Sequence, residues 1–268
     1  MNPRIHACWL LSIALLTACR GGEGAPARNE DEVIVFAAAS LRDAFTDLRK
    51  DFRPSNPGAK VTFNFAGTQE LRAQIEHGAA ADVFASADVR HMDELVRAKH
   101  VENVHVFAKN EPVVVVAARH AGDLQDFADL PRAERLIVGA EEVPIGRYTL
   151  GILENAERKL GHAWRARVEQ NVVSRELNVR QVLAKVSLGE ADAGIVYRSD
   201  VRAAQGDVRI VNIPADLNVS AEYPLAVLTH APHPKSAKQW LALVLSPVGQ
   251  RALTRAGFIA VSRDAGSD

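Results

Sequence analysis

Cysteine is scarce in this sequence: of 268 residues only Cys8 and Cys19 carry a thiol, and both lie in the first nineteen positions. If the segment before Cys19 is removed and Cys19 itself is modified, no free thiol remains. We therefore expect no disulfide, no thiolate metal site and no cysteine nucleophile in the mature protein.

An excess of charge of either sign is also missing. Lys and Arg number 32 against 33 Asp and Glu, which gives a formal net charge of -1 at pH 7. Nucleic-acid binding depends on bulk positive charge, so we expect no nucleic-acid partner. Hydrophobic residues make up 47% of the chain, which is sufficient for one large core or two medium cores.

Several enzyme motifs are absent as well. The chain contains no GxSxG, HExxH, GxGxxG or Walker sequence, so common hydrolase, metalloprotease and nucleotide-binding patterns do not apply. The nine histidines are dispersed, and the closest pair, His230 and His233, flanks prolines. We expect no metal site there, although catalytic residues can be far apart in sequence.

Residues 1–18 have the pattern of a secretory signal. Arg4 gives a positive start, and the apolar run Trp9–Leu16 is interrupted only by Ser12. This run is much shorter than the roughly 20 apolar residues of a membrane span. Its end, Leu16-Thr17-Ala18-Cys19, looks like a bacterial lipobox, in which the cysteine is diacylated and becomes the first residue. The alternative is an ordinary signal followed by a coincidental cysteine.

A short polar segment follows the signal. Residues 20–31, RGGEGAPARNED, lack bulky apolar side chains, so they bury little surface. We predict a lipidated Cys19 and a flexible tether over residues 19–31, and a folded part that begins near Glu32. The protein is expected to be exported and held at a membrane, in the periplasm or cell envelope, by lipid on Cys19.

Strand and helix patterns alternate along the rest of the chain. Val33–Ala39 is a continuous apolar run, typical of a strand buried on both faces. Ser40 stands at the N-cap position before a helical stripe of apolar residues, namely Leu41, Ala44, Phe45, Leu48 and Phe52. The continued alternation predicts an α/β fold with mostly parallel sheets flanked by helices.

Prolines divide this pattern in two. Asn110-Glu111-Pro112 separates two predicted strands, and Tyr223-Pro224 begins a later one. Proline at such a place marks an edge or a crossing between units. One large sheet is the alternative, but two breaks favour two lobes joined by two crossings. We predict that residues 32–110 and 224–268 form one lobe and residues 111–223 the other.

The strongest functional signal is a set of helix starts. Ser40, Thr68 and Asn178-Val179 each follow a strand or turn and begin a predicted helix. The first turn of a helix leaves backbone N–H groups without acceptors at the positive end of the helix dipole. Several such ends at one cleft would bind an anion through neutral donors, with hydroxyl groups adding to them. For each residue alone, simple N-capping is the alternative explanation.

Seven short motifs resemble, in order, those of the periplasmic molybdate-binding proteins of ABC importers. They are VFAAASL at Val35–Leu41, FAGTQ at Phe65–Gln69, GAAADVFASAD at Gly78–Asp88, VPIGRY at Val143–Tyr148, ELNVR at Glu176–Arg180, GIVYRSD at Gly194–Asp200, and Tyr223-Pro224. The resemblance covers most of the chain after the tether. It implies the type II periplasmic-binding fold, with two α/β lobes, a two-stranded hinge and the ligand between the lobes.

The resemblance also implies five residues that bind the oxyanion. Ser40 would contribute its hydroxyl and backbone N–H, Thr68 stands where the family usually has serine, and Tyr197 would donate its phenol O–H. Ile145 and Val179 would donate backbone N–H groups. Such a set of donors rejects a protonated anion, because that anion presents a donor to donors. The ligand implied is molybdate or tungstate, which have nearly the same size and charge.

A receptor without catalysis follows from the same resemblance. It would be a monomer that needs no cofactor, and molybdenum would enter as an oxyanion without direct metal ligands. The lobes would close around the ligand by hinge motion and dock on an ABC permease in the inner membrane. Thr68, Gln69 and Ile145 are larger than the residues usual in the family, so they bear on which anion fits. We expect the nearby side chains of Arg42, Arg72 and Arg147 to point away from the cleft.

Other functions stay open at this point. The same fold could bind sulfate, phosphate or a small organic acid, because cavity size decides between oxyanions. A lipid-anchored hydrolase could use Ser40 as a nucleophile, but it would need a base within hydrogen-bond reach, and no histidine lies near Ser40 in the sequence. A surface adhesin that has lost ligand binding is a third alternative.

Overall fold

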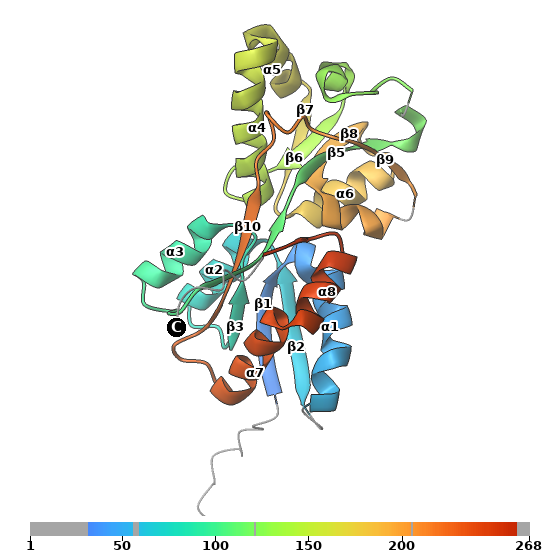
Figure 1. Ribbon diagram of the computed structural model, residues 1–268. Helices are drawn as coiled ribbons and strands as arrows, with labels where there is room; N and C mark the ends of the chain where they lie inside the picture. Colours follow the sequence, from blue (N-terminus) through green and yellow to red (C-terminus); the bar gives the residue numbers. More distant parts are fainter. Residues whose placement is uncertain (1–31, 56–58, 121, 205, 262–268) are drawn as a thin grey trace, which may run out of the picture.

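The computed structural model describes residues 32–55, 59–120, 122–204 and 206–261. The predicted signal peptide, the lipidated Cys19 and the tether lie outside the described residues. Two β-sheets are each flanked by helices, and Figure 1 shows them as two lobes, one above the other. The two-lobed α/β class predicted from the sequence is confirmed.

The first lobe contains the beginning and the end of the described chain. Its sheet has six strands in the order β11-β4-β10-β3-β1-β2. These strands are β1 (Glu32–Ala38), β2 (Lys60–Ala66), β3 (Val83–Ala85), β4 (His105–Asn110), β10 (Ala221–Val227) and β11 (Ile259–Ala260). The helices of this lobe (Figure 1) are α1 (Arg42–Ser55), α2 (Thr68–Glu76), α3 (Val89–Arg97), α7 (Pro234–Leu245) and α8 (Pro247–Arg255). A short 3-10 helix, η1 (Ala39–Leu41), joins β1 to α1.

The second lobe is formed by the middle of the chain. Its sheet has five strands in the order β7-β6-β8-β5-β9. These strands are β5 (Pro112–Ala117), β6 (Leu136–Gly139), β7 (Val172–Glu176), β8 (Ala193–Tyr197) and β9 (Val208–Val211). The helices of this lobe are α4 (Pro144–Leu160), α5 (His162–Gln170) and α6 (Val179–Ser187), with 3-10 helices η2 (Ala118–His120), η3 (Phe127–Arg132) and η4 (Arg198–Ala204).

The prediction of mostly parallel sheets is wrong, because both sheets are mixed. β1 is parallel to β2 and β3, and β6 is parallel to β7 and β8. By contrast, β5 and β10 are antiparallel to both of their neighbours. These are the two strands that bring the chain from one lobe into the other. A buried apolar run reads the same in either direction, so the sequence pattern does not reveal this reversal.

The two crossings lie next to each other. The chain leaves the first sheet at Asn110, the last residue of β4, and enters the second at Pro112. It returns between β9 and β10, and Ala221 of β10 pairs with Asn110. Strand pairing thus places residues 221–227 in the first sheet, while the division of the chain at residues 110/111 and 223/224 stays a prediction.

Each lobe has aromatic or β-branched residues at its centre. In the first lobe, the ring of Trp240 lies 5.5 Å from the rings of Phe45, Phe52 and Phe63. In the second, residues 113–116, all valine, are buried, as expected for a strand with a helix on each face. These cores hold the strand ends and helix starts in place. Within the part of the chain that the structure describes, the helices are too short or too polar to cross a membrane.

One local prediction is wrong at a residue that matters for the site. Ser40 lies inside η1 and is not an N-cap; Ala38 precedes this short helix. Its Oγ lies 2.9 Å from the Tyr223 hydroxyl, where a cap would instead contact a backbone N–H. Asn178 does cap α6 as predicted, since its side chain accepts the Gln181 N–H at 3.1 Å.

Candidate functional site

A cavity between the lobes is lined by the starts of helices. Its lining consists of thirteen residues, namely Ala38, Ala39, Ser40, Ala66, Gly67, Thr68, Ala87, Val143, Pro144, Ile145, Asn178, Val179 and Tyr197. All five predicted ligand residues are among them. The room left for the centre of a water-sized sphere is only about 10 Å³, far below the roughly 300–1,000 Å³ of pockets that hold drug-sized ligands. The cavity therefore suits a small ligand.

Three helix N-termini from the two lobes converge on this cavity. Thr68 is the first residue of α2 and Val179 the first of α6. In α4 the first residue is Pro144, which has no N–H, so Ile145 is the first that can donate. N–H groups of a first helical turn have no acceptor within their own helix and lie at its positive end. This arrangement is suited to binding an anion.

Hydroxyl groups add three more donors. Ser40, Thr68 and Tyr197 are all buried, with at most 3% of their surface exposed. Thr68 Oγ1 accepts the Ala87 N–H at 3.2 Å, so its own proton is available to another acceptor. The loop that carries Ala87 thus orients the Thr68 hydroxyl.

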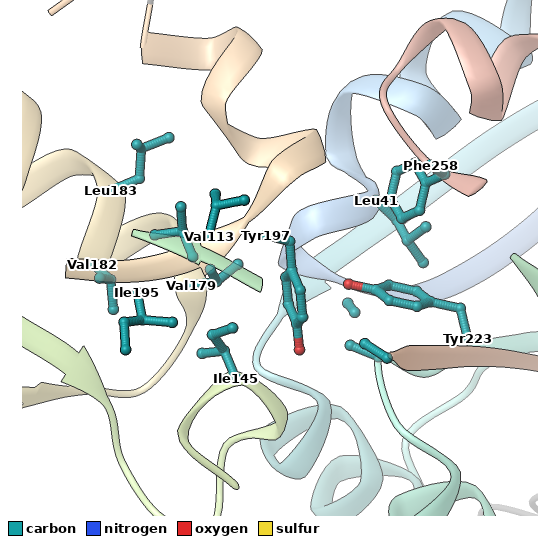
Figure 2. Close-up of a cluster of buried hydrophobic side chains, with 14 of the residues drawn as sticks. Leu41, Val113, Ile145, Val179, Val182, Leu183, Ile195, Tyr197, Tyr223 and Phe258 are labelled. Atoms are coloured by element: carbon teal, nitrogen blue, oxygen red, sulfur yellow. The ribbon is translucent and has the colours of Figure 1, made fainter. Parts of the chain in front are cut away.

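Tyr197 differs from the other two hydroxyls. Among the described residues its hydroxyl has no hydrogen-bond partner, and a buried hydroxyl left unpaired costs about 1–3 kcal/mol. Burial raises the pKa of Tyr197 well above its ordinary value, so the phenol keeps its proton, and that proton can be satisfied by an acceptor. Figure 2 shows Tyr197 between Ile145 and Val179 on one side and Tyr223 on the other.

The donors around the cavity are neutral. None of the thirteen lining residues is charged. Of the three arginines near helix starts, Arg42 lies over the Phe65 ring at 4.8 Å and Arg72 pairs with Glu76 at 3.3 Å. Arg147 is exposed, and none of the three lines the cavity. An anion held here is bound by N–H and O–H groups without a counter-charge in the lining.

An ion-pair network joins the lobes beside the cavity. Arg180, next to Val179 in α6, pairs with Asp200 at 2.8 Å and with Asp43 of α1 at 2.7 Å. Burial raises the pKa of Asp200 to about 6, while the Arg180 charge opposes that rise. Arg180 therefore holds α6 of the second lobe against α1 of the first.

Gln69 makes a second contact between the lobes. Its Nε2 donates to the carbonyl oxygen of Leu177 at 2.7 Å, and a Cβ placed on Gly67 would overlap both groups. Gln69 thus covers Gly67 at the edge of the cavity and is not among the lining residues. Of the three residues that are larger than usual, Thr68 and Ile145 border the ligand space, whereas Gln69 joins the lobes.

Metal ligands are not grouped in the described residues: no three His, Cys, Asp or Glu side chains are placed to hold an ion. The histidine pair singled out in the sequence has a structural contact, since His233 Nδ1 lies 2.9 Å from the buried carboxylate of Asp82.

Sequence reasoning missed the residue behind Ser40. Tyr223 contacts the Ser40 hydroxyl although 183 positions separate them. The Tyr223-Pro224 motif was visible in the sequence, but it gave no sign of which side chain the phenol would meet.

Comparison with known proteins agrees with this geometry. A family model described as bacterial extracellular solute-binding protein matches residues 33–259. Molybdate-binding protein ModA of Mycobacterium tuberculosis is 39% identical over 256 residues, which cover 92% of this chain and 93% of that protein. ModA of Escherichia coli is 36% identical over 209 residues, covering 75% and 78%.

A solved structure supports the fold in particular. The periplasmic molybdate-binding protein of Azotobacter vinelandii superposes with a TM-score of 0.75, covering 86% of this chain and 100% of that one. The two sequences are only 17% identical, so this likeness concerns the fold and not the ligand.

Proposed function

The chain belongs to the bacterial extracellular solute-binding protein family, and from this we propose that it captures molybdate between its lobes and delivers it to an ABC permease. The observation that carries the proposal is the cavity itself. Three helix N-termini and the unpaired Tyr197 hydroxyl converge on a small space without a charged lining residue. Such a set of neutral donors binds a dianion stripped of water.

Molybdate is the ligand that the relatives favour. The M. tuberculosis and E. coli proteins, 39% and 36% identical to this chain, are both named as molybdate-binding. We include tungstate in the proposal, because its size and charge are nearly those of molybdate. Sulfate is smaller, so a cavity of fixed size separates it from the larger ions.

Ser40 acts in this proposal as a hydrogen-bond donor and not as a nucleophile. Its hydroxyl contacts the Tyr223 phenol at 2.9 Å. Burial raises the pKa of Tyr223 well above its ordinary value, and a neutral phenol is not a base that could activate serine. We propose a receptor without catalysis and without a cofactor.

The site of action follows from the N-terminal segment. We propose that the protein is exported, that Cys19 carries lipid, and that the mature monomer works at the membrane in the periplasm or cell envelope. Mass spectrometry of the protein from a membrane fraction measures this: a chain that begins at an unmodified residue other than Cys19 contradicts the anchor.

Thermal unfolding with a series of anions tests the ligand. The purified protein is melted alone and with molybdate, tungstate, sulfate or phosphate. Ligand at 1,000 times its Kd stabilises by about 4.1 kcal/mol, which raises Tm by several degrees. We expect this rise with molybdate and tungstate and none with sulfate or phosphate.

The control is a protein with Ser40→Ala, Thr68→Val and Tyr197→Phe together, which keeps the lobes but lacks the three hydroxyl donors. It should show no rise in Tm with any anion. In the unmodified protein, a rise in Tm with sulfate or phosphate alone would mean that the ligand is a different oxyanion, with the fold assignment unchanged. No rise with any of the four anions would contradict oxyanion capture.

A further inference from the structure

Tyr223 is a buried residue that the proposed binding step does not use. It has no exposed surface, and its ring meets those of Phe107, Tyr197 and Phe258 edge-on, with centroids 6.4, 5.8 and 5.2 Å apart. In Figure 2 its hydroxyl points toward Tyr197 and away from the strand that carries it. Phenylalanine would pack equally well here, so the hydroxyl needs an explanation of its own.

The Tyr223 hydroxyl lies between two polar side chains. Asn110 Nδ2 donates to it at 3.5 Å, and Ser40 Oγ lies 2.9 Å from it. The Asn110 amide has one orientation, because its Oδ1 accepts the Glu111 N–H at 3.0 Å and its Nδ2 donates to Ser199 Oγ at 2.8 Å. An amide nitrogen only donates, so Tyr223 is the acceptor on the Asn110 side.

The direction of the contact between Ser40 and Tyr223 follows from the need to satisfy the Tyr223 proton. The phenol oxygen can accept from both Asn110 and Ser40, but the buried Tyr223 proton would then have no acceptor among the contacts of the described residues. Donation from Tyr223 to Ser40 Oγ avoids that cost. Ser40 then keeps its proton for the cavity that it lines. The reverse arrangement would turn a Ser40 lone pair toward the cavity, where the lone pairs of an oxyanion would repel it.

We propose that Tyr223, held by Asn110, is a positioning residue that orients the Ser40 hydroxyl as a donor to the bound oxyanion. This role rests on the proposed function, since it concerns the same site. Without the Tyr223 proton, the Ser40 hydroxyl is free to rotate and must be ordered when the ligand binds. A donor oriented in advance avoids that loss of affinity.

A double-mutant cycle tests the role, with the Kd for molybdate measured by calorimetry. Four proteins are compared: the unmodified chain, Tyr223→Phe, Ser40→Ala and the double variant. Tyr223→Phe keeps the ring, and the Tm of each protein without ligand shows that it is folded. We expect Tyr223→Phe to raise the Kd about tenfold when Ser40 is present, and by less than about twofold when residue 40 is alanine.

Tyr148→Phe provides a matched control. Tyr148 is only partly buried, its ring lies 6.3 Å from that of Tyr197, and its hydroxyl contacts the backbone of Glu222. It does not line the cavity, so its removal should leave the Kd unchanged.

The outcomes separate the two proposals. Equal losses from Tyr223→Phe in both backgrounds, no loss in either, or an equal loss from Tyr148→Phe would overturn the positioning role alone. An unmodified protein that binds no molybdate would overturn the proposed function, and the positioning role with it.

Discussion

The first lobe brings to the cavity hydroxyl groups that already have partners, whereas the second lobe brings a hydroxyl that has none. Ser40 contacts Tyr223 and Thr68 contacts the Ala87 N–H, both within the first lobe. Tyr197 of the second lobe is equally buried, yet its hydroxyl is without a partner among the described residues. The hydroxyl groups of the first lobe therefore already have hydrogen-bond partners, whereas the Tyr197 hydroxyl of the second lobe gains one when an acceptor binds.

This difference indicates what the ligand contributes. A ligand that accepts from Tyr197 removes the penalty of burying that hydroxyl, which is about 1–3 kcal/mol. If the lobes close by the predicted hinge motion, such a ligand would favour the closed arrangement over an open one in which water reaches the phenol.

The largest effect is expected from displacing the start of helix α4, which brings the Ile145 N–H to the cavity. In Gly146→Ala, the added Cβ would overlap the carbonyl oxygens of Ala140 and Gly139, so the start of α4 must move. We expect a loss of about 3 kcal/mol in the free energy of unfolding. Loss of the Ile145 donor should also weaken molybdate binding roughly 10- to 100-fold. Urea unfolding and calorimetry measure the two effects.

Gly151→Ala is the matched control in the same helix. There the nearest atom to an added Cβ is Val219 Cγ1 at 3.7 Å, and alanine is the better helix former by about 0.5–1 kcal/mol. Stability should rise slightly and affinity should not change. Unaltered affinity in Gly146→Ala as well would mean that α4 does not donate to the ligand.

A smaller effect is expected from removing the hydroxyl of Tyr197 or of Ser40, and the two variants should differ in stability. Tyr197→Phe removes an unpaired donor, so the free energy of unfolding without ligand should not fall and could rise by up to about 1 kcal/mol. Ser40→Ala leaves the Tyr223 hydroxyl without its acceptor and should cost about 1–3 kcal/mol. Both variants should bind molybdate roughly 10- to 100-fold more weakly. Equal destabilisation by the two substitutions would contradict the inferred difference between a paired hydroxyl in the first lobe and an unpaired one in the second.

The smallest effect is expected at the ion pair between the lobes. Asp43 is half exposed, so Asp43→Asn should weaken molybdate binding by about 0.2–1 kcal/mol. The loss should shrink when salt is raised, because salt screens exposed charges. Asp47→Asn is the control, since Asp47 lies in the same helix and pairs with Lys50 at 2.8 Å within the first lobe. Identical salt-dependent losses in both variants would exclude a role for the Asp43–Arg180 pair in closure.

Local features of the sequence predicted most elements and the set of cavity residues. Helix starts carry their signal within a few positions, as Asn178 shows by capping α6. Resemblance to a known family added Ile145 and Tyr197, which no spacing rule singles out. The structure brings all five residues to one cavity, and their role as ligands stays a prediction.

Features that depend on distant parts of the chain were not predictable. The contacts of Tyr223 with Ser40 and Asn110 span 183 and 113 positions, so no local pattern encodes them. The direction of β5 and β10 depends on where the chain crosses, which their apolar composition does not record. Helix α5 gives almost no local signal, because only Val168 of its residues is buried, which leaves no apolar stripe to detect.

The position of β10 in its sheet has a consequence for the order in which the protein forms. β10 lies between β4 and β3, so these two strands have no partner on that side until residues 221–227 are available. The second sheet uses only the continuous stretch from Pro112 to Val211. A ribosome or an export channel releases a chain from its N-terminus, and domains generally fold as units during synthesis. The first lobe, which contains the first strands to emerge, is therefore the last to complete its sheet. The second lobe can fold fully before β10 is available to the lobe that carries Ser40.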